Sequence, residues 1–171
     1  MTSAELLAQA AIAEGKYAQA FPAFGPERRG APVQAFVRIS SEPIRIRAEV
    51  TEPNIVMVLD SGLINIVKVT NGLSENGLMV VNTKSAEGVP AEMRARYNIA
   101  TVDANRIARE VLGVPIVNTT MLGALLKAAG IVELDALGEP MKKRFGKLAE
   151  KNTAALRRAY DETKIQEVTR A

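Results

Sequence analysis

The stretch Ile55-Val56-Met57-Val58-Leu59-Asp60 decides the fold class, because five successive apolar residues end in an acid. A continuous apolar run of this length is typical of a strand that is buried on both faces of a parallel sheet. Residues 78–83 read Leu-Met-Val-Val-Asn-Thr and repeat the pattern, and residues 99–102 form a third run. Helical segments separate and follow these runs, so we predict an α/β fold with a mainly parallel sheet flanked by helices.

The segments before the first run predict a helix and two strands. Residues 2–5 (Thr-Ser-Ala-Glu) have the pattern of a capping box, and apolar residues follow at helical spacing until Gly15. Residues 16–20 are expected to form a short strand. Every second residue from Val33 to Ile39 is aliphatic, which is the period of a second strand.

The segments after the first run are expected to be helical wherever they are not strands. A short helix is predicted at 63–69, and Asn118-Thr119 is interpreted as the cap of a helix at 121–129. That helix is apolar nearly all round, which is typical of burial in its own domain or in a partner interface. Further helices are expected at about 133–164. Without an internal repeat or a linker, residues 1–171 are predicted to form one domain.

The absence of two residue types limits the chemistry of the chain. Its 171 residues include no Cys and no His, so it cannot itself hold a cysteine-ligated iron–sulfur cluster, a His/Cys zinc site or a Ser-His-Asp triad. Carboxylate, Lys, Tyr or Ser/Thr chemistry, an all-oxygen metal site, or no chemistry at all remain. No apolar run approaches the roughly 20 residues of a membrane span. The start carries no secretion signal, so a cytoplasmic protein is expected.

Basic residues gather near the C-terminus. Between Met141 and Arg158, seven basic residues accompany one acid, Glu150, and one aromatic residue, Phe145. A single aromatic side chain is poor provision for stacking on bases, so nucleic acid is not an expected partner. The window is either the solvated face of amphipathic helices or a surface that steers an acidic protein partner.

A charged loop precedes the strand at 33–39, and residues 24–32 read Phe-Gly-Pro-Glu-Arg-Arg-Gly-Ala-Pro. Glycine and proline set the backbone of such a segment, so its charged triplet is expected on a fixed turn. Two interpretations remain open. The arginines bind a carboxylate or phosphate, or the triplet pins the loop or bridges to a neighbouring subunit. The candidate residues are Gly25, Pro26, Glu27, Arg28, Arg29 and Gly30.

Three polar residues at the ends of predicted strands are further candidates for ligand binding. Asp60 follows the first apolar run, and Asn82 and Thr83 end the second. The carboxyl ends of parallel strands are where α/β folds place ligands, so these side chains are candidates to face a nucleotide-like ligand. Helix capping and turn formation, which Asn, Asp and Thr perform routinely, is an equally good interpretation.

Together with residues 14–22 (Glu-Gly-Lys-Tyr-Ala-Gln-Ala-Phe-Pro), the charged loop makes the chain resemble the gamma subunit of the pyruvate/2-oxoacid:ferredoxin oxidoreductases. The resemblance extends through residues 59–60, 80–84 and 118–124. It implies a non-catalytic α/β subunit that completes an enzyme with alpha-, beta- and delta-type subunits. Such enzymes make acyl-CoA from a 2-oxoacid, here expected to be pyruvate, and reduce ferredoxin or a related acceptor. Thiamine diphosphate and iron–sulfur clusters are implied to lie mainly on other chains, and coenzyme A partly against this one.

One departure from the family concerns the start of the chain. Family members typically begin with a strand and a Gly-Arg-Gly-Gly-Gln-Gly type of loop, whereas this sequence begins at the helix that follows. The absence of this first strand is expected to leave unpaired backbone groups beside the strand from Ile55. Each unpaired group would cost roughly 1–3 kcal/mol of stability. Either the start lies upstream or a partner fills the gap. The alternative hypothesis for the whole chain is a free-standing nucleotide- or CoA-binding α/β module.

Overall fold

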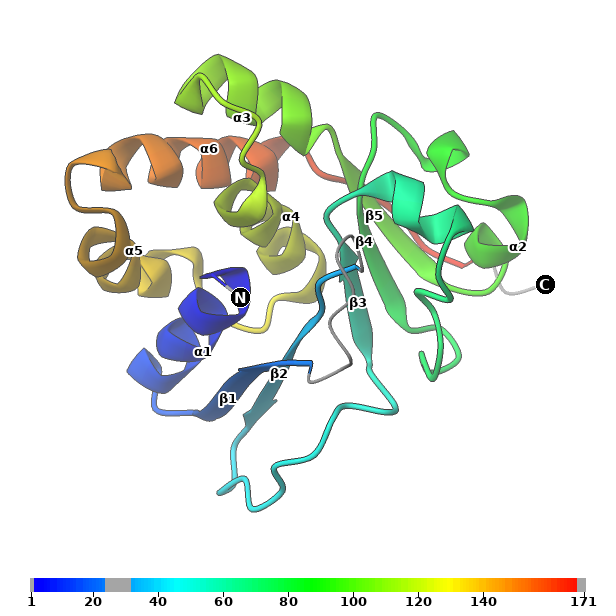
Figure 1. The fold of residues 1–171 in the computed structure, drawn as a ribbon, viewed down its shortest axis with the longest axis horizontal. Coiled ribbons are helices and arrows are strands. Elements are labelled where there is room, and N and C mark those ends of the chain that lie inside the picture. The colour runs from blue at the N-terminus through cyan, green and yellow to red at the C-terminus, as the bar shows by residue number, and fades with distance from the viewer. Residues whose placement is uncertain (1, 24–31, 169–171) are drawn as a thin grey trace.

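The chain folds into a small sheet with its longer helices gathered on one side (Figure 1). The computed structural model describes residues 2–23 and 32–168. The elements in chain order are α1 (Thr2–Ala13), β1 (Tyr17–Pro22), β2 (Ala35–Ser40), β3 (Ile55–Val58), η1 (Ser61–Asn65), β4 (Leu78–Asn82), η2 (Ala86–Gly88), α2 (Ala91–Arg94), β5 (Asn98–Val102), α3 (Ala104–Leu112), α4 (Asn118–Ala129), η3 (Leu134–Leu137), α5 (Gly138–Phe145), η4 (Gly146–Leu148), α6 (Ala149–Glu162) and β6 (Lys164–Gln166). The predicted α/β class is confirmed.

Three parallel strands lie side by side in a four-stranded sheet with the order β3-β4-β5-β6. Ile55 is opposite Leu78 in the first pair, and Leu78 is opposite Asn98 in the second. The three apolar runs therefore form neighbouring parallel strands, as predicted. β6 pairs antiparallel with β5, although a helix had been expected to continue to residue 164. This strand is short and exposed, so no apolar pattern marks it in the sequence.

The middle strands are buried more completely than β3. β4 is buried from Met79 to Asn82, and β5 is buried from Ile99 to Val102. In β3 only Val58 is buried and the other residues are half-buried. The expectation of burial on both faces is therefore wrong for most of β3, because this strand lies at the edge of its sheet.

β1 and β2 form a separate antiparallel hairpin in which Gln19 is opposite Arg38. Side chains on one face of the hairpin, including Ala18 and Val37, pack against the main hydrophobic core. The two predicted strands are confirmed with shifted ends. Among the described residues, the edge of β3 away from β4 has no backbone partner, which agrees with the expected unpaired edge.

The turn from α1 into β1 is fixed by the residues Glu14, Gly15 and Lys16. The Lys16 ammonium donates to the Glu14 carboxylate at 2.8 Å and to the carbonyl oxygen of Ile131 at 2.6 Å. Glu14 in turn accepts from the backbone N–H of Glu133. Gly15 has φ +80°, which suits glycine. These contacts explain why an acid, a glycine and a base follow one another at residues 14–16.

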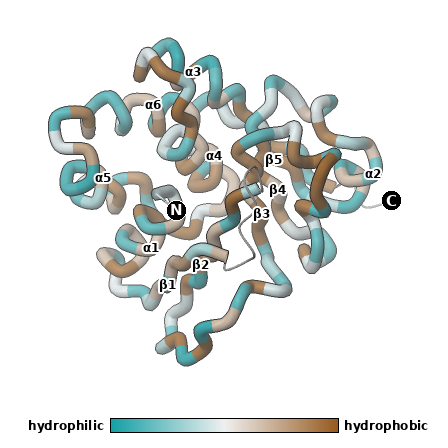
Figure 2. The backbone as a smooth tube through the Cα atoms, viewed as in Figure 1, coloured by the Kyte–Doolittle hydropathy of each residue, from teal (hydrophilic) through white to brown (hydrophobic). Residues whose placement is uncertain are grey.

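Most of the hydrophobic core lies between the sheet and helices α1, α4 and α6, where apolar segments converge (Figure 2). Helix α4 is buried from Thr119 to Leu126, so the predicted buried helix is confirmed. The interpretation of Asn118-Thr119 as its cap is wrong, because the helix already begins at Asn118 and no side chain caps its first turn. Its Gly123 lies against α6, where a Cβ would be 2.0 Å from the carbonyl oxygen of Leu156. The two helices therefore approach each other closely only because residue 123 has no side chain.

Candidate functional site at the carboxyl ends of the strands

The charged loop that was the leading candidate, with Gly25, Pro26, Glu27, Arg28, Arg29 and Gly30, lies outside the described residues. The segments at its two ends are described. β1 ends at Pro22, and the Ala23 N–H donates to the carbonyl oxygen of Gln34 at 3.1 Å, which closes the neck of the hairpin. The loop residues stay candidates for binding on their sequence alone.

Asn82 is a buried link between the end of β4 and its neighbours. Its side-chain amide donates to the carbonyl oxygen of Leu59 at 2.9 Å and accepts from the N–H of Ala104 at 3.0 Å. Only 4% of the residue is exposed. These bonds join the chain after β3 to the first turn of α3. They give Asn82 a structural role, and a ligand role remains a prediction.

Asp60 caps the short helix η1. Its carboxylate accepts from the Gly62 N–H at 2.9 Å, and the residue is exposed at the end of β3. A Cβ at Gly62 would lie 3.1 Å from the same carboxylate oxygen, so glycine suits this turn. The helix starts and ends earlier than the predicted segment at 63–69. Its start is set by this cap, which is a local signal in the sequence.

Thr83 lies half-buried beside the ends of β4 and β5. Its backbone N–H points to the carbonyl oxygens of Val81, at 3.0 Å, and Val102, at 3.1 Å. A Cβ at Gly88 would lie 2.2 Å from the Thr83 hydroxyl oxygen, so a larger residue at position 88 would force the Thr83 side chain to move. Lys84 follows as an exposed cation. The structure thus places Asp60, Asn82 and Thr83 at one end of the parallel strands, as expected.

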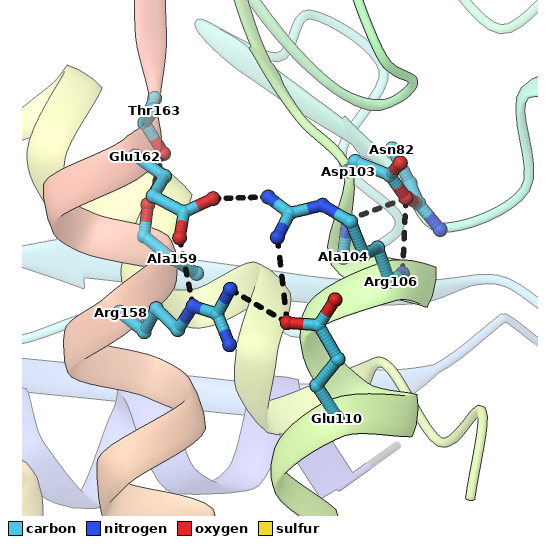
Figure 3. A network of polar contacts seen from close by, with 9 residues as sticks. All are labelled: Asn82, Asp103, Ala104, Arg106, Glu110, Arg158, Ala159, Glu162 and Thr163. Atoms are coloured by element: carbon cyan, nitrogen blue, oxygen red, sulfur yellow. Dashed lines mark hydrogen bonds and ion pairs between the residues drawn. The ribbon is translucent and has the colours of Figure 1, made fainter.

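A network of charged residues lies beside this edge and joins α3 to α6 (Figure 3). Arg158 contacts Glu110 at 2.6 Å and Glu162 at 2.7 Å. Arg106 contacts Glu110 at 3.5 Å and also pairs with Glu162. Asp103 caps α3 by accepting from the Arg106 N–H at 3.0 Å. Only the i,i+4 pairs were visible in the sequence, because the others join residues that are far apart in the chain.

The network lowers the pKa of Glu162 and raises the pKa of Arg106 and Arg158, as ion pairing dictates. Hydrogen bonding from the Arg158 guanidinium is the largest cause that lowers the pKa of Glu162, and Arg106 acts in the same direction. Hydrogen bonding to Glu162 raises the pKa of Arg106 and of Arg158. Glu162, Arg106 and Arg158 therefore stay charged at neutral pH, which favours a role in joining the helices.

Several cations of the basic C-terminal window are also paired within the chain. Arg157 contacts Asp135 at 2.6 Å, and Arg144 lies 3.8 Å from Glu5. Lys143 and Lys147 are exposed and have no ion pair with a described residue. The solvated-face interpretation accounts for much of this window.

A hollow in the described surface lies away from the predicted site residues. Its volume is about 720 Å³, and apolar, polar and basic residues line it, among them Ile64, Lys68, Asn71, Arg96 and Tyr97. Asp60, Asn82 and Thr83 are not among the lining residues. Within residues 2–23 and 32–168, no group of three acidic side chains is placed to hold a metal ion. None of the described helices has both the length and the apolar character that crossing a bilayer requires.

Comparison with known proteins places this geometry in a family. Residues 1–162 match the family described as pyruvate ferredoxin/flavodoxin oxidoreductase. The chain is 50% identical to the pyruvate/ketoisovalerate oxidoreductases common subunit gamma of Pyrococcus furiosus, with 98% of this chain and 92% of that protein covered. It is also 50% identical to the pyruvate synthase subunit PorC of Methanothermobacter marburgensis, with 96% and 90% covered.

A solved structure agrees with this match. The crystal structure of the pyruvate oxidoreductase subunit PORC from Thermotoga maritima has a TM-score of 0.80 and 38% sequence identity, with 97% of this chain and 90% of that chain covered. The chain therefore belongs to the pyruvate ferredoxin/flavodoxin oxidoreductase family. Within that family it is a gamma-type subunit of a 2-oxoacid:ferredoxin oxidoreductase.

Proposed function

We propose that this chain is the non-catalytic gamma subunit of a thiamine-diphosphate-dependent oxidoreductase that converts pyruvate and coenzyme A to acetyl-CoA and reduces ferredoxin or a related acceptor. The observation that carries the proposal is the 50% identity, over nearly the whole chain, to a subunit named for pyruvate and ketoisovalerate oxidoreductases. Alpha-, beta- and delta-type chains are its proposed partners. The cytoplasmic location expected from the sequence remains a prediction.

The residues of the chain agree with a division of labour between subunits. An iron–sulfur cluster needs thiolate ligands, and the sequence contains no Cys. The clusters of the complex therefore belong on partner chains. Thiamine diphosphate, which supplies the carbanion chemistry of decarboxylation, is proposed to lie there as well. The contribution of this chain is then to assembly and to the surroundings of coenzyme A.

The charged loop is the proposed contact with coenzyme A or with a neighbouring subunit. Arginine guanidinium groups bind phosphates and carboxylates through paired hydrogen bonds, which both types of contact require. The backbone hydrogen bond between Ala23 and Gln34 holds together the two segments that flank this loop, which supports the proposal. Asp60, Asn82 and Thr83 are proposed only as secondary ligand contacts, because Asn82 and Asp60 already bind backbone groups.

The test is purification of the tagged chain from its native host, followed by sizing chromatography and assays with a panel of 2-oxoacids. We expect a large complex that carries thiamine diphosphate and iron–sulfur clusters and reduces ferredoxin in a CoA-dependent reaction, with pyruvate the best substrate. The chain produced alone should be colourless and inactive. Activity of the single chain would contradict the subunit role, and a monomer or dimer in the native extract would favour the free-standing module.

A further inference from the structure

The connection between β2 and β3 is an extended arm, which we define as residues 41–54. It contains no helix or strand and forms the excursion that follows the hairpin in Figure 1. Its length exceeds roughly 12 residues, above which a loop without secondary structure is uncommon in a compact domain and is usually functional. Most of its residues are exposed. Packing within this chain therefore does not explain why the arm is long and extended.

The arm has the sequence of a strand. Residues 44–50 read Ile-Arg-Ile-Arg-Ala-Glu-Val, so apolar and charged residues alternate with the period of a half-buried strand. The structure shows no backbone pairing of this segment with any described residue. Ile46, in the middle of the pattern, is 62% exposed. A strand pattern without a sheet partner indicates that the partner lies on another chain.

The outer face of the hairpin holds the arm through side chains rather than through a backbone ladder. Arg38 donates to the carbonyl oxygens of Ala48, at 2.6 Å, and Glu49, at 3.0 Å. Gln19 donates to the carbonyl oxygen of Ile44 at 3.4 Å. These bonds use carbonyl groups of the arm. From Ile44 to Val50, no backbone N–H donates to an acceptor among the described residues.

The same face of the hairpin carries exposed and half-buried aromatic residues. Tyr17, Phe21 and Phe36 share this face with Gln19 and Arg38, as the pairing register shows. The rings of Phe21 and Phe36 are 5.5 Å apart, and the Arg38 guanidinium carbon lies 5.8 Å from the centre of the Phe21 ring. Among the described residues that are buried, by contrast, the only aromatic one is Tyr97, which directly precedes β5. Aromatic residues and arginine are enriched at the centres of protein interfaces.

An unpaired polar atom lies within this surface. The side-chain carbonyl oxygen of Gln19 is buried and has no hydrogen-bond partner among the described residues. A buried acceptor without a partner costs roughly 1–3 kcal/mol. The contact between the arm and the hairpin therefore leaves one polar atom unsatisfied within the described chain.

We propose that the arm and the outer face of the hairpin dock an extended segment of a different subunit of the oxidoreductase, with carboxylates at alternate positions facing Arg45 and Arg47. Both arginines are exposed, and neither forms an ion pair with a described residue. The two arginines are two residues apart, so in a strand they would lie on one face. Acids on every second residue of an added strand could therefore pair with them. A second copy of this chain would bring the same cations to the junction. The inference rests on the proposed function, which supplies the partner subunits.

The first test reverses the charge of the arm. The tagged chain with Arg45→Glu and Arg47→Glu is purified from the native host beside the wild type, and the fraction bound to subunits with 2-oxoacid-dependent ferredoxin reduction is measured at rising salt. We expect a loss of about tenfold or more, because opposed charges become like charges. Lys143→Glu with Lys147→Glu makes the same change on exposed residues elsewhere and should leave assembly intact.

The second test measures hydrogen exchange of the wild-type complex. The amides of residues 44–50 should exchange at least about tenfold more slowly there than in a synthetic peptide of residues 41–54, because strand pairing protects them. Unprotected amides in an active complex, or unchanged assembly of the arm variant, would overturn the docking proposal alone. Binding of two copies of the chain through the arm would overturn it too. A wild-type chain that brings no oxidoreductase activity would instead contradict the proposed function.

Discussion

Helix α4 and the segment that leads through β1 both carry sequence that resembles the oxidoreductase family, but their residues make different kinds of contact. In α4, the residues that resemble the family pack against and hydrogen-bond to other residues of this chain. Gly123 allows close approach to α6, and the buried Thr119 hydroxyl donates to Asn152 at 2.8 Å. In the hairpin, Glu14 and Lys16 fix a turn, whereas Tyr17 and its neighbours on the outer face are only partly covered.

This difference indicates two separate reasons why a segment resembles the family: its residues stabilise the chain, or they contact another chain. Residues of the α4–α6 contact are set by packing and buried hydrogen bonds, so changes there should lower the stability of the chain. The aromatic residues on the outer face of the hairpin, Tyr17, Phe21 and Phe36, are not fully buried within the described chain, so changes there should lower assembly. The comparison would fail if variants of the helix contact left stability unchanged.

Replacement of Gly123 by alanine should have the largest effect. The added Cβ would lie 2.0 Å from the carbonyl oxygen of Leu156 and 2.9 Å from the backbone nitrogen of Tyr160, so the helices must separate. Overpacking of a core costs roughly 1–3 kcal/mol, and contact with rigid backbone places this case at about 3 kcal/mol. Urea unfolding of the purified chain measures the change. Gly138→Ala is the matched control, because a Cβ there meets nothing within 4 Å.

Two adjacent threonines give the next largest contrast. Thr119→Val removes the bond to Asn152 inside the protein, which should cost about 1–3 kcal/mol because a buried acceptor loses its donor. Thr120→Val removes a buried hydroxyl that has no partner among the described residues, so stability should stay within about 0.5 kcal/mol or rise. The same unfolding measurement serves for both. Equal losses from the two variants would contradict the assigned role of the Thr119–Asn152 bond.

The sequence predicted those parts of the fold that local patterns determine. The apolar runs that become β3, β4 and β5 and the all-round apolar helix α4 were recognisable, because burial on several sides leaves few polar residues. The unpaired edge of β3 was expected only from the resemblance to the family, since the order of strands in a sheet depends on which strands pair. The short exposed strand β6 carries no apolar signal at all.

The candidate site was predicted in part for the same reason. Polar residues after buried strands indicated that Asp60, Asn82 and Thr83 gather at one edge, and they do. The two bonds of the Asn82 amide could not be foreseen, because one of them reaches Ala104 across 22 positions of sequence. The cross-helix pair of Arg106 and Glu162 joins positions 56 apart and was equally hidden.

The smallest expected effect on stability comes from the charged network between α3 and α6, and this effect depends on pH. Ion pairing with Arg158 and Arg106 lowers the pKa of Glu162 below its ordinary value of 4.5, so the carboxylate stabilises the folded chain above that pH. This contribution is lost as the pH falls through the lowered folded-state pKa. Glu162→Gln should therefore reduce the melting temperature slightly at pH 7, since partly exposed pairs contribute little, and the reduction should shrink as the pH falls below 4.5.

Thermal unfolding at a series of pH values measures the difference between Glu162→Gln and the wild type. Glu150→Gln on the same helix is the control, because Glu150 is exposed and forms no ion pair with a described residue. Its melting temperature should follow the wild type at every pH. A loss in Glu162→Gln that persisted unchanged at low pH would show that the side chain acts through packing rather than charge. The α3–α6 junction would then resemble the α4–α6 contact instead of an electrostatic link between the two helices.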